Sequence, residues 1–93
     1  MQVNVRILQI CCQFMADPKT RLWSYAIARK LEMDDRTVAF ALARLERNGW
    51  LTSEWERVDH VGWRPRRKLY RLTELGRKQT TESLARLKIS VSG

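Results

Sequence analysis

Apolar residues in the first third of the chain recur about every three to four positions, the spacing of one face of a helix. This pattern predicts a helix over residues 3–15. Asp17-Pro18 ends that helix, because proline disfavours the helical conformation in the residue before it. A short extended piece and a second helix over residues 25–32 follow, and Ser24 has a suitable side chain to cap the second helix.

A third helix is expected over residues 36–47, one short turn after the second. Asp34-Asp35 supply a cap and a first-turn acid, and Asn48-Gly49 is typical of a left-handed helix end. Apolar side chains occupy one side of this helix, as in a half-buried helix. The buried stripe is expected to hold Val38, Ala41, Leu42 and Leu45, and the solvent face Arg36, Phe40, Ala43 and Arg47, flanked by Thr37 and Arg44.

Two strands joined by a basic loop come next. β-favouring residues occupy 50–56 and 68–72, and the segment between them contains Gly62 and Pro65, so a hairpin is expected. Thr73 then caps a last helix. This order of elements is that of a winged helix-turn-helix. The predicted fold class is α+β and mostly helical, with a two- or three-stranded wing sheet and a C-terminal helix.

The charge of the chain narrows the choice of partner. The 93 residues include 18 Lys+Arg and 10 Asp+Glu, a net charge of +8. Such an excess favours a polyanion, most often nucleic acid. It is concentrated in residues 36–71, where nine basic and four acidic side chains leave +5, and five of the eight residues from Arg64 to Arg71 are basic.

Several other classes of protein find little support. No stretch approaches the ~20 apolar residues of a membrane helix, and the N-terminus lacks a secretory pattern, so a cytoplasmic protein is expected. Cys11 and Cys12 are adjacent and far from His60, which offers no metal-binding set. Neither a nucleophile elbow nor a phosphate-binding glycine loop is present, so we expect no enzyme and no cofactor.

Two stretches resemble known regulators. The first, residues 27–51, is similar to the helix-turn-helix of bacterial winged-helix regulators. The second, residues 53–76, resembles the wing of the PadR-like family of transcriptional regulators, in which a Gly/Arg/Pro-rich loop leads into Tyr-x-Leu-Thr-x-x-Gly. Tyr70 to Gly76 match that segment. The chain departs from the family in the third helix, where Ala39 and Phe40 stand in place of a Tyr-Pro pair.

The resemblance implies a bacterial or phage-type transcriptional regulator, taken as a repressor, that binds double-stranded DNA as a homodimer. Residues 1–77 would form the DNA-binding domain, and residues 78–93 a C-terminal helix and tail that can dimerise. Because PadR-like proteins often bind aromatic small molecules between subunits, an aromatic effector is a further candidate partner. Two alternatives stay open: a winged-helix module that binds protein, and a basic protein associated with RNA or the ribosome.

DNA contacts are expected on the third helix and in the wing. The solvent face of such a helix fits the major groove, and a basic loop beside it suits contact with phosphates or the minor groove. Phe40 has three readings: packing on a thymine methyl, burial under the wing, or contact with a partner subunit. The predicted DNA-binding residues are Arg36, Thr37, Phe40, Arg44 and Arg47, followed by Arg64, Arg66, Arg67 and Lys68 in the wing.

The first helix carries more apolar side chains than one stripe needs against a small core, which predicts a homodimer. The predicted dimerisation residues are Val3, Ile7, Ile10, Phe14, Leu84 and Leu87. The four tryptophans are expected to differ in role: Trp50 lies in the core, Trp55 covers the sheet, Trp23 packs onto the second helix, and Trp63 is exposed.

Overall fold

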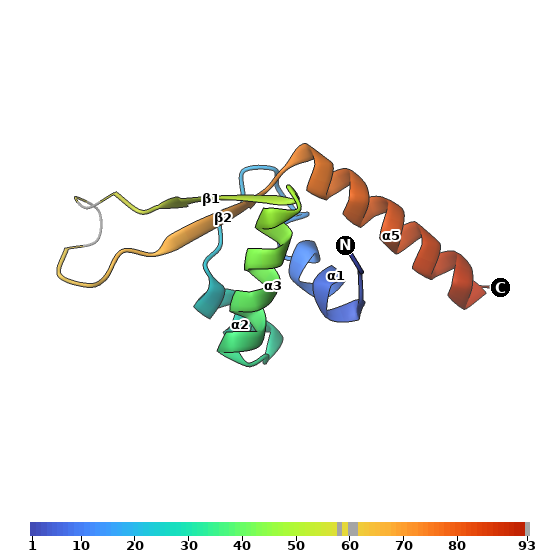
Figure 1. Cartoon of the computed structure of the whole chain (residues 1–93), viewed down its shortest axis with the longest axis horizontal. Coiled ribbons are helices and arrows are strands. Elements are labelled where there is room, and N and C mark those ends of the chain that lie inside the picture. The colour runs from blue at the N-terminus through green and yellow to red at the C-terminus, as the bar shows by residue number, and fades with distance from the viewer. Residues whose placement is uncertain (58, 60–61, 93) are drawn as a thin grey trace.

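The protein forms three helices around one core, a projecting β-hairpin and a long C-terminal helix (Figure 1). The structure, a computed structural model, describes residues 1–57, 59 and 62–92. Within these ranges no helix is both long enough and apolar enough to cross a membrane. The elements are α1 (Val5–Cys12), α2 (Ser24–Leu31), α3 (Asp35–Arg47), β1 (Leu51–Trp55), β2 (Lys68–Leu72) and α5 (Glu74–Ser92).

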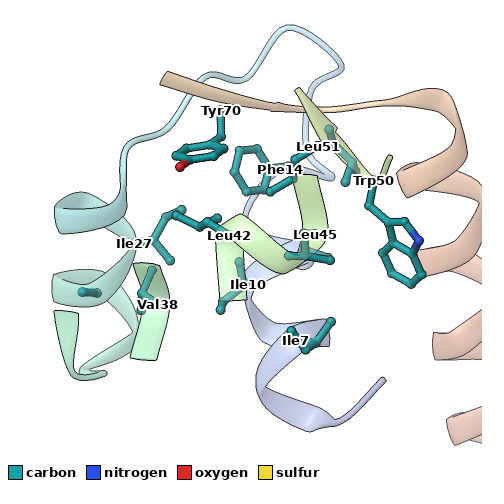
Figure 2. Close-up of a cluster of buried hydrophobic side chains, with 13 residues drawn as sticks. Ile7, Ile10, Phe14, Ile27, Val38, Leu42, Leu45, Trp50, Leu51 and Tyr70 are labelled. Carbon is teal, nitrogen blue, oxygen red and sulfur yellow. The ribbon is translucent and has the colours of Figure 1, made fainter. Parts of the chain in front are cut away.

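The core lies between the three N-terminal helices and the start of the hairpin (Figure 2). The expected apolar stripe of α3 is confirmed, because Val38, Leu42 and Leu45 have no exposed surface. Trp50 is also buried, as expected for the residue that follows the turn after α3. Removal of such side chains from water is the dominant stabilising contribution in a small domain. The other elements supply Ile7, Ile10, Cys11, Phe14, Ile27, Ala28, Leu51, Tyr70 and Leu72.

The turn between α2 and α3 is set by local hydrogen bonds and backbone conformation. Glu32 ends α2 in the left-handed region, with φ of 54°. Asp34 Oδ2 accepts hydrogen bonds from the N–H groups of Arg36 at 3.0 Å and Thr37 at 3.2 Å, which confirms the expected cap. Gly49, with φ of 80°, ends α3 as expected.

The first helix is shorter than expected. Its start moves to Val5 because Asn4 Oδ1 accepts a hydrogen bond from the N–H of Ile7 at 2.9 Å, an N-cap that the apolar pattern does not reveal. It ends at Cys12, well before Asp17-Pro18, in a series of turns. The expectation that Asp17-Pro18 ends the helix is therefore wrong.

The start of α2 also differs from expectation, whereas the start of the last helix agrees with it. Ser24 is the first residue of α2 and not its cap: Trp23 occupies the cap position and makes no side-chain capping bond. The last helix has 19 residues and begins at Glu74. Thr73 caps it as expected, since its Oγ1 accepts a hydrogen bond from the N–H of Gly76 at 2.9 Å. α5 is thus continuous across the expected boundary between residues 77 and 78.

The hairpin is antiparallel and is anchored on the helical body. Its register pairs Leu51 with Leu72 at the core end and Trp55 with Lys68 at the outer end. Leu22 adds an isolated bridge to Tyr70, with hydrogen bonds of 3.1 and 2.7 Å in the two directions. The expected extended piece before α2 therefore pairs beside β2. The hairpin projects from one side of the core and α5 from the other (Figure 1).

Candidate nucleic-acid interface

The outer face of α3 is the first part of the candidate interface. Since Val38, Leu42 and Leu45 face the core, the opposite side of the helix is turned to solvent. Phe40 is 70% exposed, which rules out its burial under the wing. The other residues expected on this face are also accessible: Arg36, Ala43, Arg44 and Arg47 are exposed, and Thr37 is half-buried.

The cations of α3 are available for an external anion. Among the ion pairs formed by the described residues, none involves Arg36, Arg44 or Arg47. Arg6, in the first turn of α1, adds a cation that the sequence did not single out. It lines a shallow hollow of about 260 Å³ together with Asn4, Ile7, Thr37, Phe40, Ala41 and Arg44. Its proximity to α3 depends on how α1 packs, so no local sequence signal could have found it.

In the wing, the carboxylate of Glu56 links the end of β1 to the residues before β2. Glu56, directly after β1, accepts hydrogen bonds from Arg64 Nη1 at 2.8 Å and Arg64 Nη2 at 3.1 Å. It also accepts one from the N–H of Arg67 at 2.8 Å, and its own N–H donates to the carbonyl of Arg67 at 2.9 Å. The Arg64 guanidinium lowers the pKa of Glu56 to about 2 and the carboxylate raises the pKa of Arg64.

The four wing cations predicted to contact DNA therefore have different surroundings. Arg64 is bound by Glu56 and has a side chain only 31% exposed. The Arg67 guanidinium carbon lies 4.2 Å from the centre of the Trp23 ring, a cation–π contact at the base of the wing. Lys68 Nζ lies 3.7 Å from a carboxylate oxygen of Glu46. Arg66 is exposed and stands outside these interactions.

Trp55 differs from the role expected of it, and Trp23 has a contact that was not expected. Trp23 supports Arg67, and its packing on α2 stays a prediction. Trp55 is exposed, because it ends β1 beyond the helices that cover the sheet, so the expectation that it covers the sheet is wrong. The expected exposure of Trp63 is confirmed. His60 lies outside the described residues. A cleft of about 320 Å³ beside the wing is lined by Trp23, Ser24, Trp55, Arg66, Arg67, Lys68 and Tyr70.

The residues predicted for dimerisation are largely not on the surface. Ile7, Ile10 and Phe14 are 3%, 0% and 1% exposed, so they form the core of the single chain and have no surface to offer a second copy. Val3 is half-buried against that core. Another stripe of α1 instead meets α5 along an apolar groove of about 240 Å³, lined by Val5, Leu8, Gln9, Cys12, Gln13, Leu31, Leu84 and Leu87.

Comparison with known proteins gives a consistent result. The model of the transcriptional regulator PadR-like family matches residues 31–82, more than half of the chain. No curated protein matches the sequence of this chain. A PadR family transcriptional regulator from Eggerthella lenta DSM 2243 has a similar structure, with a TM-score of 0.80 and 25% identity over 95% of this chain and 76% of that one.

Two further solved structures share the fold. A PadR family transcription regulator from Clostridium difficile R20291 has a TM-score of 0.76 at 21% identity, over 92% of this chain and 91% of that one. Bacillus subtilis PadR, solved in complex with operator DNA, has a TM-score of 0.74 at 19% identity, over 89% of this chain and 48% of that one. The predicted winged-helix fold class is confirmed, and these neighbours are described as regulators of transcription and not as enzymes.

Proposed function

This chain belongs to the PadR-like family of transcriptional regulators, and from that premise we propose that it binds double-stranded DNA, with α3 in the major groove and the basic wing on the phosphate backbone. The observation that carries the proposal is the solvent face of α3, where Arg36, Arg44 and Arg47 are exposed and outside the ion pairs of the described residues. The operator complex of Bacillus subtilis PadR, which shares the fold, supports this assignment.

In this proposal the two parts of the interface have different tasks. Arg36, Thr37, Phe40 and Arg44 read bases, because side chains on the outer face of a helix in the major groove reach base edges and thymine methyl groups. Arg47, Arg66, Arg67 and Lys68 bind phosphates, which adds affinity for every duplex. Arg66 is the wing residue with the most accessible cation, whereas Arg64 would first have to leave Glu56.

A salt titration of duplex binding tests the proposal. Fluorescence anisotropy with a labelled random duplex should give a log–log dependence of affinity on salt with a slope of about −0.9 for each phosphate contact. A slope near zero would favour a module that binds protein. An RNA duplex of the same length is the parallel sample, and tighter binding to RNA than to DNA would support the alternative of an RNA-associated protein.

Base reading is tested on an operator obtained by genomic-site selection. Replacing a base-reading residue such as Arg36 or Phe40 by Ala should cost about 1–3 kcal/mol on the operator and much less on random DNA. Arg47→Ala is the matched control on the same helix, with an equal loss expected on both DNAs. Equal losses for Arg36→Ala as well would make it a phosphate contact. The repressor assignment is tested by a reporter gene placed behind the selected operator.

A second copy of the chain is the proposed occupant of the apolar groove between α1 and α5. Val5 and Leu87 are exposed apolar side chains on the two helices that form it. Two-fold pairing there would remove both from water and present two α3 helices to one side of the DNA, with half-sites ~10 bp apart. The predicted contribution of Leu84 and Leu87 is retained, with the exposed Val5 and Cys12 of α1 in place of its buried stripe.

Two leucines of α5 make a matched test of the dimer. Leu87 is 45% exposed and lines the groove, whereas Leu75 is 46% exposed and lies outside it. Leu87→Glu should yield a monomer in sedimentation at micromolar concentration, and Leu75→Glu should leave the dimer intact. A dimer that survives Leu87→Glu would place the interface elsewhere, and a native chain that stays monomeric on DNA would end the proposal. An aromatic effector stays a candidate partner that the family resemblance implies.

A further inference from the structure

We propose that Glu56 is a positioning residue for DNA binding: through Arg64 and Arg67 it fixes the backbone on both sides of Arg66 and so presents the Arg66 side chain to a phosphate. This inference rests on the proposed function, in which the wing contacts the DNA backbone. It assigns a role in binding an anion to an acidic residue, which the basic composition of the wing alone would not suggest.

The first step of the argument is the number of bonds that meet at Glu56. Its carboxylate accepts three hydrogen bonds, two from the Arg64 guanidinium and one from the N–H of Arg67. Its backbone N–H donates to the carbonyl of Arg67 at 2.9 Å. The Glu56 side chain is only 16% exposed, so these bonds are partly shielded from water. Glu56 thereby joins the two arms of the wing beyond the last β pair, Trp55 with Lys68.

The second step concerns the two peptide groups that flank Arg66. The N–H of Arg67 belongs to the peptide that follows Arg66, and it is held by Glu56 Oε1 at 2.8 Å. The carbonyl of Pro65 belongs to the peptide that precedes Arg66, and it accepts a hydrogen bond from Arg64 Nη1 at 3.1 Å. Arg64 is itself oriented by Glu56. Both peptides of Arg66 are therefore held by the same ion pair, while the Arg66 side chain is exposed.

The third step concerns whether removal of the Glu56 carboxylate weakens or strengthens DNA binding. Charge alone predicts that removal of an acidic residue from a DNA-binding wing strengthens binding, because the carboxylate repels phosphates. Preorganisation predicts the opposite, because an unrestrained loop must be ordered at the moment of binding. The low pKa of Glu56, about 2, means that the residue carries its charge at neutral pH. The two explanations therefore predict opposite changes in affinity for the same substitution.

Glu54 provides a matched control. It lies two residues earlier in β1, on the same side of the strand, and carries the same charge in an exposed ion pair with Arg21 at 2.8 Å. Glu56→Gln and Glu54→Gln remove equal charge. Only Glu56→Gln also removes one of the two carboxylate oxygens that accept hydrogen bonds from Arg64. Glu56→Ala removes all the side-chain acceptors and extends the comparison to complete loss of the clamp.

The experiment measures duplex affinity of the full chain against salt for these variants, at a temperature where urea unfolding shows each to be folded. We expect Glu56→Gln and Glu56→Ala to bind more weakly and to lower the log–log slope by about 1, the loss of one phosphate contact. Over a fourfold change of salt this is roughly a 3.5-fold smaller change in affinity. Glu54→Gln should bind as tightly as the native chain or more tightly, with an unchanged slope.

Double variants separate positioning from direct contact. If Glu56 acts through Arg66, then Arg66→Ala alone should reproduce the lowered slope, and adding Glu56→Ala to it should cause no further loss. Arg64→Ala should likewise add nothing to Glu56→Ala. A further slope decrease of about 1 on adding Arg64→Ala would identify Arg64 as a phosphate contact and overturn the assignment of Arg64 to the clamp.

Other outcomes are equally decisive. Unchanged or tighter binding by Glu56→Ala, with only its unfolding midpoint lowered, would show that the clamp stabilises the wing without positioning Arg66, and would overturn the inference while DNA binding stands. A native chain whose duplex affinity does not depend on salt would instead refute the proposed function, and the inference with it.

Discussion

Gly76→Ala should strongly destabilise the protein, although alanine is the better helix former. Gly76 lies in the first turn of α5, where an added Cβ would be 2.2 Å from the carbonyl oxygen of Trp50 and 2.9 Å from its carbonyl carbon. Leu72 Cδ1, at 2.7 Å, can move by a side-chain rotation. The Trp50 carbonyl cannot move so easily, because it accepts hydrogen bonds from the N–H of Thr73 at 2.9 Å and from Thr73 Oγ1 at 3.1 Å.

The size of the stability loss follows from the contacts that the added methyl group would disrupt. Overpacking against a fixed neighbour costs about 1–3 kcal/mol, and loss of the two hydrogen bonds to Trp50 adds about 1 kcal/mol each. The helix propensity of alanine offsets about 1 kcal/mol of this cost. We therefore expect a loss of about 3 kcal/mol in the free energy of unfolding, which for a domain of this length lowers Tm by at least ~12 °C.

Urea unfolding followed by far-UV circular dichroism measures this loss. Lys78→Ala, two residues later on the exposed side of α5, is the control and should change stability by less than about 0.5 kcal/mol. The reasoning about Gly76 is refuted if Gly76→Ala is as stable as Lys78→Ala. Since Gly76 sets how closely α5 approaches the backbone of Trp50, the same variant should also weaken dimerisation through the groove of α1 and α5.

Three further predictions concern ionisation, thiol reactivity and the outer face of α3. The pKa of folded Glu56 is lowered from 4.5 to about 2, so the stabilisation from its ion pair is complete above about pH 5 and is lost as the pH falls towards 2. Urea titrations of the native and Glu56→Gln proteins should therefore show a difference in unfolding free energy that shrinks over that pH range. Burial raises the pKa of Cys11 to about 11, whereas Cys12 is exposed in the single chain and lines the groove proposed for the dimer. In the monomeric Leu87→Glu variant, maleimide at pH 7.5 should therefore label one thiol in the folded chain and two in urea, as counted by mass spectrometry. Phe40→Ala should leave Tm unchanged within about 2 °C while it lowers operator affinity, because the ring is 70% exposed; a large fall in Tm would show that the ring is a packing residue.

Local sequence determined most of the helix-turn-helix. The cap at Asp34, the left-handed turn at Gly49 and the alternation of buried and exposed positions on α3 depend on neighbours within one or two helical turns. The solvent face of α3 could therefore be predicted from periodicity. The match of residues 70–76 with the family pattern could also be recognised from the sequence alone. The close approach of Gly76 to the Trp50 carbonyl gives a physical reason for the glycine.

Tertiary packing decided what periodicity left open. α1 carries two apolar stripes, and only the arrangement of the other helices selects the one with Ile10 for the core and the one with Val5 for the groove beside α5. The wing shows the same limit, because composition cannot distinguish a cation bound by Glu56 from one that is exposed. The roles of Arg64 and Arg66 depend on contacts across the hairpin, and these contacts exist only once the register of β1 and β2 is set.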